Sequence, residues 1–444
     1  MAGEGVRVVG MTVEDLRFPT SLTRAGSDAV HDPDYSAVYV TLTTDSQDVP
    51  EAHGLTFTIG RGNEVVAAAA WALRPLVVGH AVGELRRDLR AFWRSLVDDP
   101  QLRWLGPEKG VFHLATAAVV NTVWDLLARV AEKPLWKLLV DMSPGELVGA
   151  IDFRYVADAL TPAEAVRLLE ARASRREERE AQVLEQGVPA YTTSAGWLGY
   201  SDEEVARLAG EAVAEGWRAL KIKVGPDVEQ NLRRGRAVRA AIGPDVALML
   251  DANQCWELAE ACDQVAALRE LDPYWIEEPT SPDDVLAFAE LSRRFPELRF
   301  ATGEHVHNRV MFKQFFQARA IQVCQPDVCR LAGVNETLAV LLLAAKHDVP
   351  VCFHAGGVGL CEQAQHLAIF DLVRVAATTN GRLLEYVDEL HEHFVDPVRV
   401  VGGSYEPPRA GGCGVTVTDS ARVAFAFPSG SVWRARPQPV AVGG

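Results

Sequence analysis

The sequence lacks the cysteine patterns that hold small extracellular domains or zinc sites together. Its seven cysteines are odd in number, and no two of them are spaced as C-x-x-C. A disulfide framework needs paired cysteines, and structural zinc sites usually take closely spaced thiols. The sequence therefore predicts neither, and unpaired thiols of this kind are typical of a reducing compartment such as the cytoplasm.

Long apolar runs are also missing. The longest ones, such as residues 338–345, fall far short of the roughly 20 residues that span a bilayer. The N-terminal segment has no basic stretch followed by a long apolar run, so no secretory signal is expected. We therefore expect a cytoplasmic protein with no membrane partner.

Basic residues are fewer than acidic ones. The chain has 44 Lys and Arg against 60 Asp and Glu, which gives a formal net charge of -16 at pH 7. Nucleic-acid binding relies on clustered Lys and Arg that neutralise phosphates, and no such cluster stands out. The charge argues against a nucleic-acid partner.

The length of 444 residues favours two domains, one of which can be a barrel of about 250 residues. Residues 37–43 and 55–59 are rich in Val, Tyr, Thr and Phe, which predicts a small antiparallel sheet. From residue 63 to about 139 the apolar period lengthens to that of helices. We expect three consecutive parts: an α+β capping domain in 1–145, a catalytic barrel in 146–399, and a tail, 400–444, packing back towards the capping domain.

Residues 160–186 interleave Arg and Glu in a helix-prone run. A solvated helical excursion with charge pairs one turn apart explains this pattern better than a binding element does.

From residue 189 onward, short apolar strands that end in a polar residue alternate with helices. Eight such strands imply an α/β fold built as a parallel β/α barrel. The predicted strands are 190–193, 219–223, 246–251, 275–277, 300–302, 321–324, 351–353 and 383–386.

Ionisable residues mark the ends of seven of these strands, and successive ones are 23 to 31 residues apart, about one strand and helix. Residues at the carboxyl ends of barrel strands converge on the mouth, where such barrels carry their active sites. We therefore expect one pocket to collect Lys221, Asp251, Glu277, Glu304, Asp327, His354 and Glu385.

Three carboxylates on adjacent strand ends form a candidate metal site: Asp251 in LMLDANQ, Glu277 in WIEEP and Glu304 in ATGEH. Alone, each could be a helix cap or a solvated group. Together they would repel one another unless a cation joined them, and hard oxygen ligands without a His or Cys set favour Mg²⁺. The sequence therefore predicts a magnesium site.

Lys221 and Lys223 alternate with Ile222 on one strand, so both ammonium groups point to the same face. A surface lysine pair is an alternative, but the surrounding ALKIKV is apolar and belongs inside. A second lysine and a divalent cation nearby would lower the pKa of Lys223 and make it a plausible proton acceptor.

Asp327 in CQPDVCR and His354 in CFHAGG would end neighbouring strands. A carboxylate beside an imidazole fixes its tautomer and raises its basicity, so His354 could donate or accept a proton. A lone His in an apolar strand is usually structural, but the glycines after His354 give an open loop where a ligand can approach.

Two further residues have open roles. Glu385 in RLLEYVD could hydrogen-bond the substrate or a developing oxyanion if it is protonated, or form a salt bridge to Arg382. Asn253 could reach the substrate or cap the following helix.

In order along the chain, K-x-K, the three carboxylates and the Asp/His pair resemble the mandelate-racemase subgroup of the enolase superfamily. That resemblance implies a (β/α)₇β barrel, like a TIM barrel, with an α+β capping domain. It also implies Mg²⁺, a small-molecule carboxylate substrate that loses its α-proton, and assembly as a homo-oligomer.

Within the subgroup the chain is similar to L-fuconate dehydratases over residues 15–408, including GSDAVHDPDYSAVYV and AYTTSAGWLGYSD. The resemblance makes Lys223 the base, His354 with Asp327 the acid, and Asp251, Glu277 and Glu304 the metal ligands. It also implies a sugar-acid substrate, contacted by Gly26, Ser27, Asp28, Tyr35, Lys221, Asn253 and Glu385.

Three alternatives stay open. Another aldonate or aldarate could be the substrate, and a racemase or epimerase could use the same Lys and His to exchange a proton. A barrel that binds without catalysis is the alternative from a different class, although each catalytic position holds a competent residue.

Overall fold

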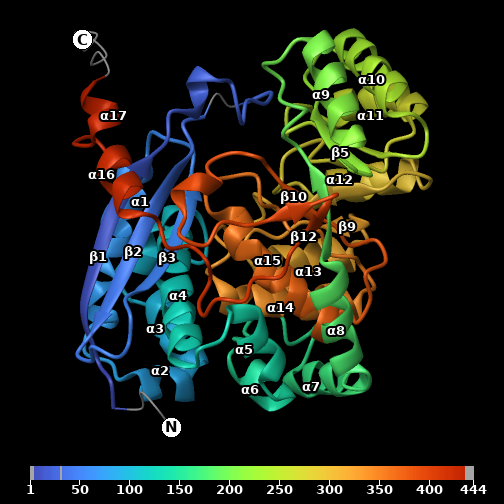
Figure 1. The fold of residues 1–444 in the computed structure, drawn as a ribbon. Coiled ribbons are helices and arrows are strands. Elements are labelled where there is room, and N and C mark those ends of the chain that lie inside the picture. The colour runs from blue at the N-terminus through green and yellow to red at the C-terminus, as the bar shows by residue number, and fades with distance from the viewer. Residues whose placement is uncertain (1–4, 31–32, 436–444) are drawn as a thin grey trace.

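A computed structural model describes residues 5–30 and 33–435. Near the N-terminus three strands form an antiparallel sheet in which β2 pairs with both β1 and β3 (Figure 1). The strands are β1 (Val8–Arg17), β2 (Ser36–Thr44) and β3 (Ala52–Thr58). This confirms the predicted small antiparallel sheet.

Helices pack beside this sheet, and the longest of them, α4, is nearly all buried. The helices on the sheet side are α1 (Asn63–Ala72), α2 (Val82–Arg87), α3 (Leu89–Val97) and α4 (Gly110–Val130), whereas α5 (Leu135–Asp141) and α6 (Pro144–Gly149) lie below the barrel helices in Figure 1. By length and composition α4 could cross a membrane, but 94% of its apolar window lies inside the protein. The expectation that apolar stretches are too short is thus wrong for α4. Single polar residues break its apolar runs without lowering its mean hydropathy much.

α4 joins the capping part to the barrel through buried polar contacts with α14 (Val334–Lys346). Trp124 Nε1 donates to Asn335 Oδ1 at 2.8 Å, and His113 Nε2 lies 2.5 Å from Glu336 Oε2. Buried polar groups need such partners, so these pairs fix how the two parts meet.

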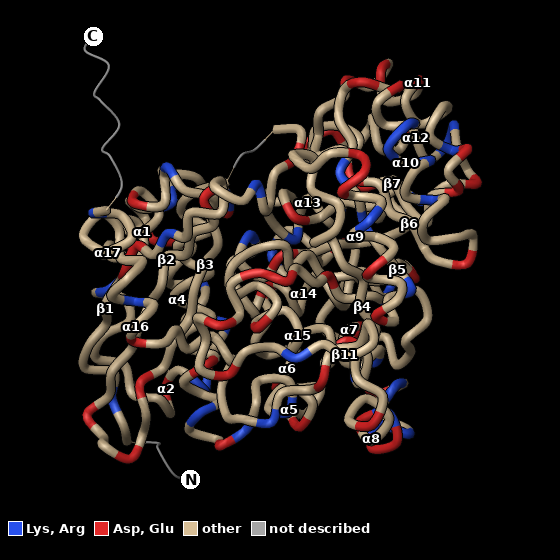
Figure 2. Tube along the Cα trace, turned by 45° about the horizontal axis from the view of Figure 1, so that its top comes forward, with Lys and Arg blue, Asp and Glu red and all other residues tan. Residues whose placement is uncertain are grey.

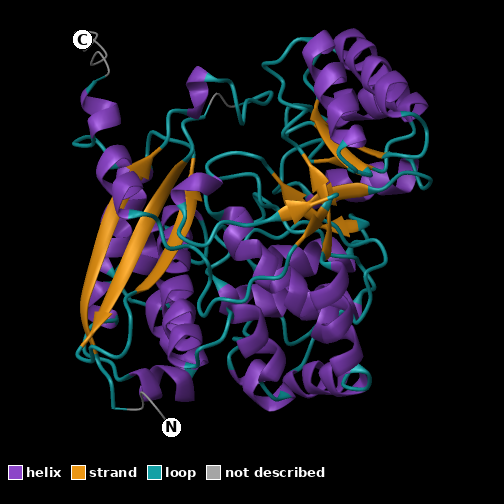
Figure 3. Cartoon of the chain, viewed as in Figure 1, coloured by secondary structure: helices purple, strands orange, loops and turns teal. Residues whose placement is uncertain are grey.

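The second sheet is the barrel (Figure 3), in which parallel strands pair in the order β4-β5-β6-β7-β8-β9 and β10 pairs with β4. Its strands are β4 (Val188–Thr192), β5 (Ala219–Lys223), β6 (Ala247–Asp251), β7 (Trp275–Glu277), β8 (Phe300–Thr302), β9 (Val323–Cys324) and β10 (Leu384–Tyr386). Buried side chains such as Tyr191, Met249 and Trp275 fill the interior as a separate apolar cluster.

The predicted strand at 351–353 is not a regular strand. It makes one bridge, Val351 to Cys324, and Cys352 N donates to Cys324 O at 2.9 Å. On its other side Glu385 N lies 3.4 Å from Phe353 O. The segment therefore closes the barrel between β9 and β10, although its hydrogen bonds are too few to form a regular ladder.

The predicted barrel with a capping domain is confirmed.

Helices follow the barrel strands on the outside (Figure 1). They are α9 (Asp202–Ala214), α10 (Val228–Ile242), α11 (Leu258–Leu268), α12 (Val285–Arg294), α13 (Arg309–Gln317), α14, and α15 (Leu360–Phe370), which continues into a π-helical turn, η5 (Asp371–Val375).

The predicted excursion consists of two helices, α7 (Pro162–Ala171) and α8 (Arg176–Gln186). Acidic and basic residues are mixed along α8, as Figure 2 shows, and Arg175 pairs with Glu178 at 2.7 Å. The predicted helices are confirmed, but this pair, three residues apart, is the one local charge pair among the described residues of the run. Glu164 and Glu180 pair instead with the distant Lys346 and Lys137.

The last described segment returns to the N-terminal sheet. β11 (Val400–Val401) and β12 (Ser404–Tyr405) form a hairpin that pairs with β4. α16 (Asp419–Phe425) and α17 (Ser431–Arg434) then lie beside β1, where Phe427 N donates to Asp15 O at 2.8 Å. Residues 436–444 of the predicted tail lie outside the described residues.

Candidate active site

Strand register brings the first site residues into one row. Lys223 lies opposite Asp251, and Asp251 lies opposite Glu277. All three occupy the last position of their strands, so the parallel sheet presents them together at its carboxyl end. The spacing along the sequence predicted this convergence.

The three predicted metal ligands offer one oxygen each within 4.8 Å of one another. Asp251, Glu277 and Glu304 are all buried. Burial, and then the nearby Asp251 carboxylate, raise the pKa of Glu277 to about 8, so the site disfavours a third negative charge. A bound cation would relieve this repulsion.

The donor set fits Mg²⁺. The three ligands are carboxylates, the hard oxygen donors that Mg²⁺ prefers, and no Cys or His belongs to this group. Beside them, Asn253 Oδ1 is buried without a hydrogen-bond partner in the described structure. An orphaned buried acceptor that lines a cavity calls for a ligand, so both features indicate a site built to be filled.

Lys221, a predicted substrate contact, does not line the cavity; it is almost wholly buried and is held by carboxylates. Its Nζ is 2.6 Å from Glu277 Oε1 and 2.9 Å from Glu385 Oε1. Burial disfavours the ammonium, but these two partners raise its pKa well above the usual value. Lys221 is therefore a fixed positive charge and not a proton acceptor.

Lys223 lines the cavity, and its Nζ is 2.6 Å from Asp251 Oδ2. The lowered pKa expected for Lys223 depends on a divalent cation beside it and stays a prediction. Burial is the largest influence and lowers the pKa of Lys223, but the Asp251 carboxylate together with Glu304 and Asp28 gives a net rise. A cation on Asp251 would weaken that pairing.

His354 and Asp327 form the predicted pair. His354 Nδ1 lies 2.7 Å from Asp327 Oδ2, while Asp327 Oδ1 accepts backbone N–H groups of Cys329 and Arg330. Burial lowers the pKa of His354, but Glu304 and then Asp327 raise it to about 9. The imidazole is held protonated, with Nδ1 on Asp327 and Nε2 3.3 Å from Glu304 Oε2 at the cavity, which suits a proton donor.

Glu385 is ionised in this structure. Burial raises its pKa, but Lys221 and other cations dominate and lower it to about 2. Its oxygens also accept Thr193 Oγ1 at 2.6 Å and Ala355 N at 3.0 Å. The suggested salt bridge to Arg382 is absent among the described contacts, because Arg382 pairs with Asp371 at 2.8 Å.

Of the four capping-domain residues predicted to contact the substrate, three line the cavity and one does not. Gly26, Asp28 and Tyr35 line the cavity. Gly26 has φ +80°, and a Cβ there would lie 2.6 Å from the Tyr35 ring, so only glycine fits. Ser27 does not line the cavity, because its Oγ accepts Gly199 N at 3.0 Å and ties the capping loop to the barrel.

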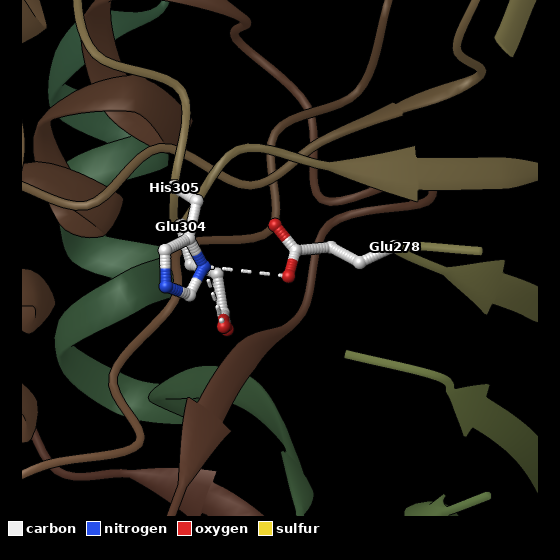
Figure 4. A group of neighbouring side chains, drawn as sticks. All are labelled: Glu278, Glu304 and His305. Carbon is white, nitrogen blue, oxygen red and sulfur yellow. Dashed lines mark ion pairs between the residues drawn. The ribbon is translucent and has the colours of Figure 1, made fainter. Parts of the chain in front are cut away.

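The cavity itself holds about 270 Å³, room for one small molecule. Sequence reasoning missed several residues that line the cavity, among them Arg61 and Trp197. The ring centroid of Trp197 lies 5.8 Å from Lys223 Nζ. It also missed His305, which directly follows Glu304 and approaches it in space (Figure 4). Its place beside a metal ligand in ATGEH was the available signal.

A buried carboxylate triad, a lysine and an Asp-paired histidine around one barrel mouth define a class: metal-dependent enzymes that move protons next to a carboxylate. Residues 204–421 match the family described as enolase C-terminal domain-like. The chain belongs to the enolase superfamily.

Relatives are similar along nearly the whole chain. Human mitochondrial enolase superfamily member 1 has a crystal structure with a TM-score of 0.95 and 50% identity, covering 96% of this chain and 98% of that one. The L-galactonate dehydratase of Hypocrea jecorina is 47% identical over 95% of this chain and 94% of its own. Dehydratases and cycloisomerases among the relatives support a lyase-type enzyme.

More distant solved structures share the fold. The L-talarate/galactarate dehydratase of Salmonella typhimurium LT2, crystallised with Mg and L-lyxarohydroxamate, has a TM-score of 0.73 at 22% identity, covering 94% of this chain and 92% of that one. That Mg belongs to the Salmonella structure; in this chain the buried carboxylate triad is the feature that fits Mg²⁺.

Proposed function

We propose that this protein is a magnesium-dependent dehydratase of sugar acids whose substrate is L-fuconate. The observation that carries the proposal is the placement of Lys223 and His354. They line one cavity from barrel positions separated by β4 and β10, with the carboxylate triad beside them. A base and an acid on two sides of one small molecule suit removal of a proton and of a hydroxyl.

In the proposed reaction Lys223, as the neutral amine, takes the C2 proton of the acid. His354 then gives its Nε2 proton to the departing C3 hydroxyl, which leaves as water. The resulting enol ketonises to 2-keto-3-deoxy-L-fuconate. Asp327 keeps His354 in the tautomer and orientation for this transfer, since it accepts from Nδ1 at 2.7 Å.

The substrate carboxylate would face the triad Asp251, Glu277 and Glu304. Mg²⁺ held there supplies positive charge for the electrons that move onto the carboxylate when C2 loses its proton. Lys221, a buried cation fixed by Glu277 and Glu385, adds to the same field. Asn253 Oδ1 is free to accept a substrate hydroxyl.

The choice of L-fuconate rests on the capping-loop sequence and on the cavity wall. L-fuconate is 6-deoxy-L-galactonate, so it differs from the substrate named for the fungal relative only by a methyl in place of a hydroxymethyl. Part of the cavity wall is apolar, with Phe57, Ile59 and Leu114. An apolar wall favours the methyl by about 1–3 kcal/mol.

A panel of aldonic and aldaric acids tests the substrate. With Mg²⁺, we expect 2-keto-acid formation, read by semicarbazide absorbance, with kcat/KM for L-fuconate about 10-fold or more above that for L-galactonate. EDTA should abolish it, and Lys223→Ala protein purified in parallel controls for contaminating activity. A preference for L-galactonate would refute the substrate assignment, and no keto acid from any member would refute the dehydratase.

A racemase or epimerase is the second candidate, because two proton-transfer groups that face one cavity also suit exchange at C2. It predicts a C2 epimer without loss of water.

We also propose a cytoplasmic location, which the seven free thiols support.

A further inference from the structure

His305 lies between two carboxylates at the edge of the metal site (Figure 4). Its Nδ1 is 3.2 Å from Glu304 Oε1 and 3.4 Å from Glu278 Oε2. Glu304 is one of the three candidate metal ligands, whereas Glu278 is outside that triad. The imidazole therefore connects a ligand to a carboxylate behind it.

Glu278 is not one of the three candidate metal ligands, yet its side chain is fixed in place. It is fully buried, and its oxygens accept Gln254 Nε2 at 2.7 Å and Thr302 Oγ1 at 3.3 Å. Gln254 Nε2 also lies 2.7 Å from His305 Nδ1. Glu278 and Gln254 thus approach the same ring nitrogen as Glu304 and help to hold the imidazole beside it.

The backbone here is strained in a way that serves this contact. Glu278 has φ +42° and Gln254 has φ +65°, left-handed values that cost about 1–3 kcal/mol each for such residues. Main-chain bonds maintain them, with Gln254 N donating to Glu278 O at 2.7 Å and Glu278 N to Ala301 O at 2.9 Å. Without the left-handed turn, Glu278 would follow the strand alternation, and its side chain would point to the barrel exterior.

We propose that His305, held by Glu278 and Gln254, is a positioning residue that orients the Glu304 carboxylate for the metal ion. Groups behind metal ligands commonly fix ligand orientation, and their loss weakens metal binding about 10- to 100-fold. The inference rests on the metal site and not on which sugar acid is the substrate.

Two other roles for His305 are outcomes of the test. Since His305 lines the cavity, it could instead contact the substrate. Alternatively, Glu278, Glu304 and His305, whose ligand atoms lie within 4.8 Å of one another, could hold a cation of their own. Substrate contact would change kcat/KM at saturating metal, and a second site would change the metal stoichiometry.

The test is Mn²⁺ binding without sugar acid, read from the free Mn²⁺ signal in electron paramagnetic resonance and confirmed for Mg²⁺ by calorimetry. We expect one ion per chain in the wild type. His305→Leu should bind about 10- to 100-fold more weakly. His305→Gln, whose amide can still donate to Glu304, should recover most of this loss.

The control and a double mutant sharpen the result. His307→Gln changes the same loop at a histidine that faces Asp283 at 3.6 Å, and it should leave Mn²⁺ affinity unchanged. Glu278→Gln should weaken binding, and His305→Leu with Glu278→Gln should be no weaker than His305→Leu alone, because both act through one contact. At saturating Mg²⁺ the kcat/KM of His305→Leu should return close to wild type.

Four results would overturn the proposal. These are wild-type affinity in folded His305→Leu, additive losses in the double mutant, two ions per wild-type chain, or a kcat/KM of His305→Leu that stays low at saturating Mg²⁺. Because the binding assay contains no sugar acid, an incorrect substrate assignment leaves its result unchanged.

Discussion

Replacing Lys223 with Ala is expected to lower kcat for keto-acid formation by about 10²- to 10⁴-fold, the contribution of a general base. Lys223 is the cavity-lining lysine, with its Nζ beside Asp251. Lys221 cannot replace it, because Glu277 and Glu385 hold its ammonium and it does not line the cavity. The measurement is the initial rate with L-fuconate at saturating substrate and Mg²⁺.

The matched control is Lys137→Ala, which removes a lysine that pairs with Asp141 and Glu180 and does not line the cavity. Its rate should stay at the wild-type value. If Lys223→Ala, folded and able to bind Mn²⁺, keeps a rate within tenfold of wild type, Lys223 is not the base.

Replacing His354 with Asn is expected to remove dehydration by a similar factor of about 10²–10⁴, while exchange of the C2 proton with solvent continues. His354 donates to the departing hydroxyl, whereas Lys223, on a strand beyond β4 and β10, is untouched. Exchange of the C2 proton should therefore continue in His354→Asn while loss of the C3 hydroxyl stops. Proton NMR in deuterated water measures both, as loss of the C2–H signal and as appearance of the C3 signal of the product.

His347→Asn serves as the control, because His347 follows α14 on the outside of the barrel. It should affect neither half-reaction. Loss of both exchange and dehydration in folded His354→Asn would mean that His354 is needed for proton abstraction. Undiminished dehydration would mean that it is not the acid.

The barrel and the row of strand ends could be predicted because both depend on local patterns. Apolar strands at regular intervals specify parallel pairing, and register then places Lys223, Asp251 and Glu277 side by side. The alternation of Lys221 and Lys223 around Ile222 gave the orientation of both ammonium groups. No long-range information was needed for these residues.

The parts that could not be predicted depend on contacts between distant segments. Val351–Phe353 has the composition of a strand, but β9 offers it too few partners to form a ladder. Ser27 seemed a substrate contact, yet its hydroxyl binds Gly199, 172 residues away. Trp197 reaches the cavity from a loop whose path depends on such contacts.

The direction of the pKa shift of Lys223 also could not be predicted, because it depends on distances between distant segments. The sequence places Lys221 two residues away, which lowers the pKa of Lys223, but it gives no distance to Asp251. In the structure that carboxylate is 2.6 Å away, and together with Glu304 and Asp28 it gives a net rise in the pKa of Lys223 despite burial and Lys221. Close opposite charges decide the sign of a pKa shift, and only the fold fixes such distances.

The central claim is that this site removes the C2 proton and the C3 hydroxyl of a sugar acid in a magnesium-dependent reaction. Proton NMR of wild-type protein with L-fuconate in deuterated water, with Mg²⁺ and with EDTA, tests it most directly. The account predicts a 2-keto-3-deoxy acid that carries deuterium at C3, and no product with EDTA. Recovery of the acid or its C2 epimer with deuterium only at C2, or product formation that EDTA does not affect, would contradict it.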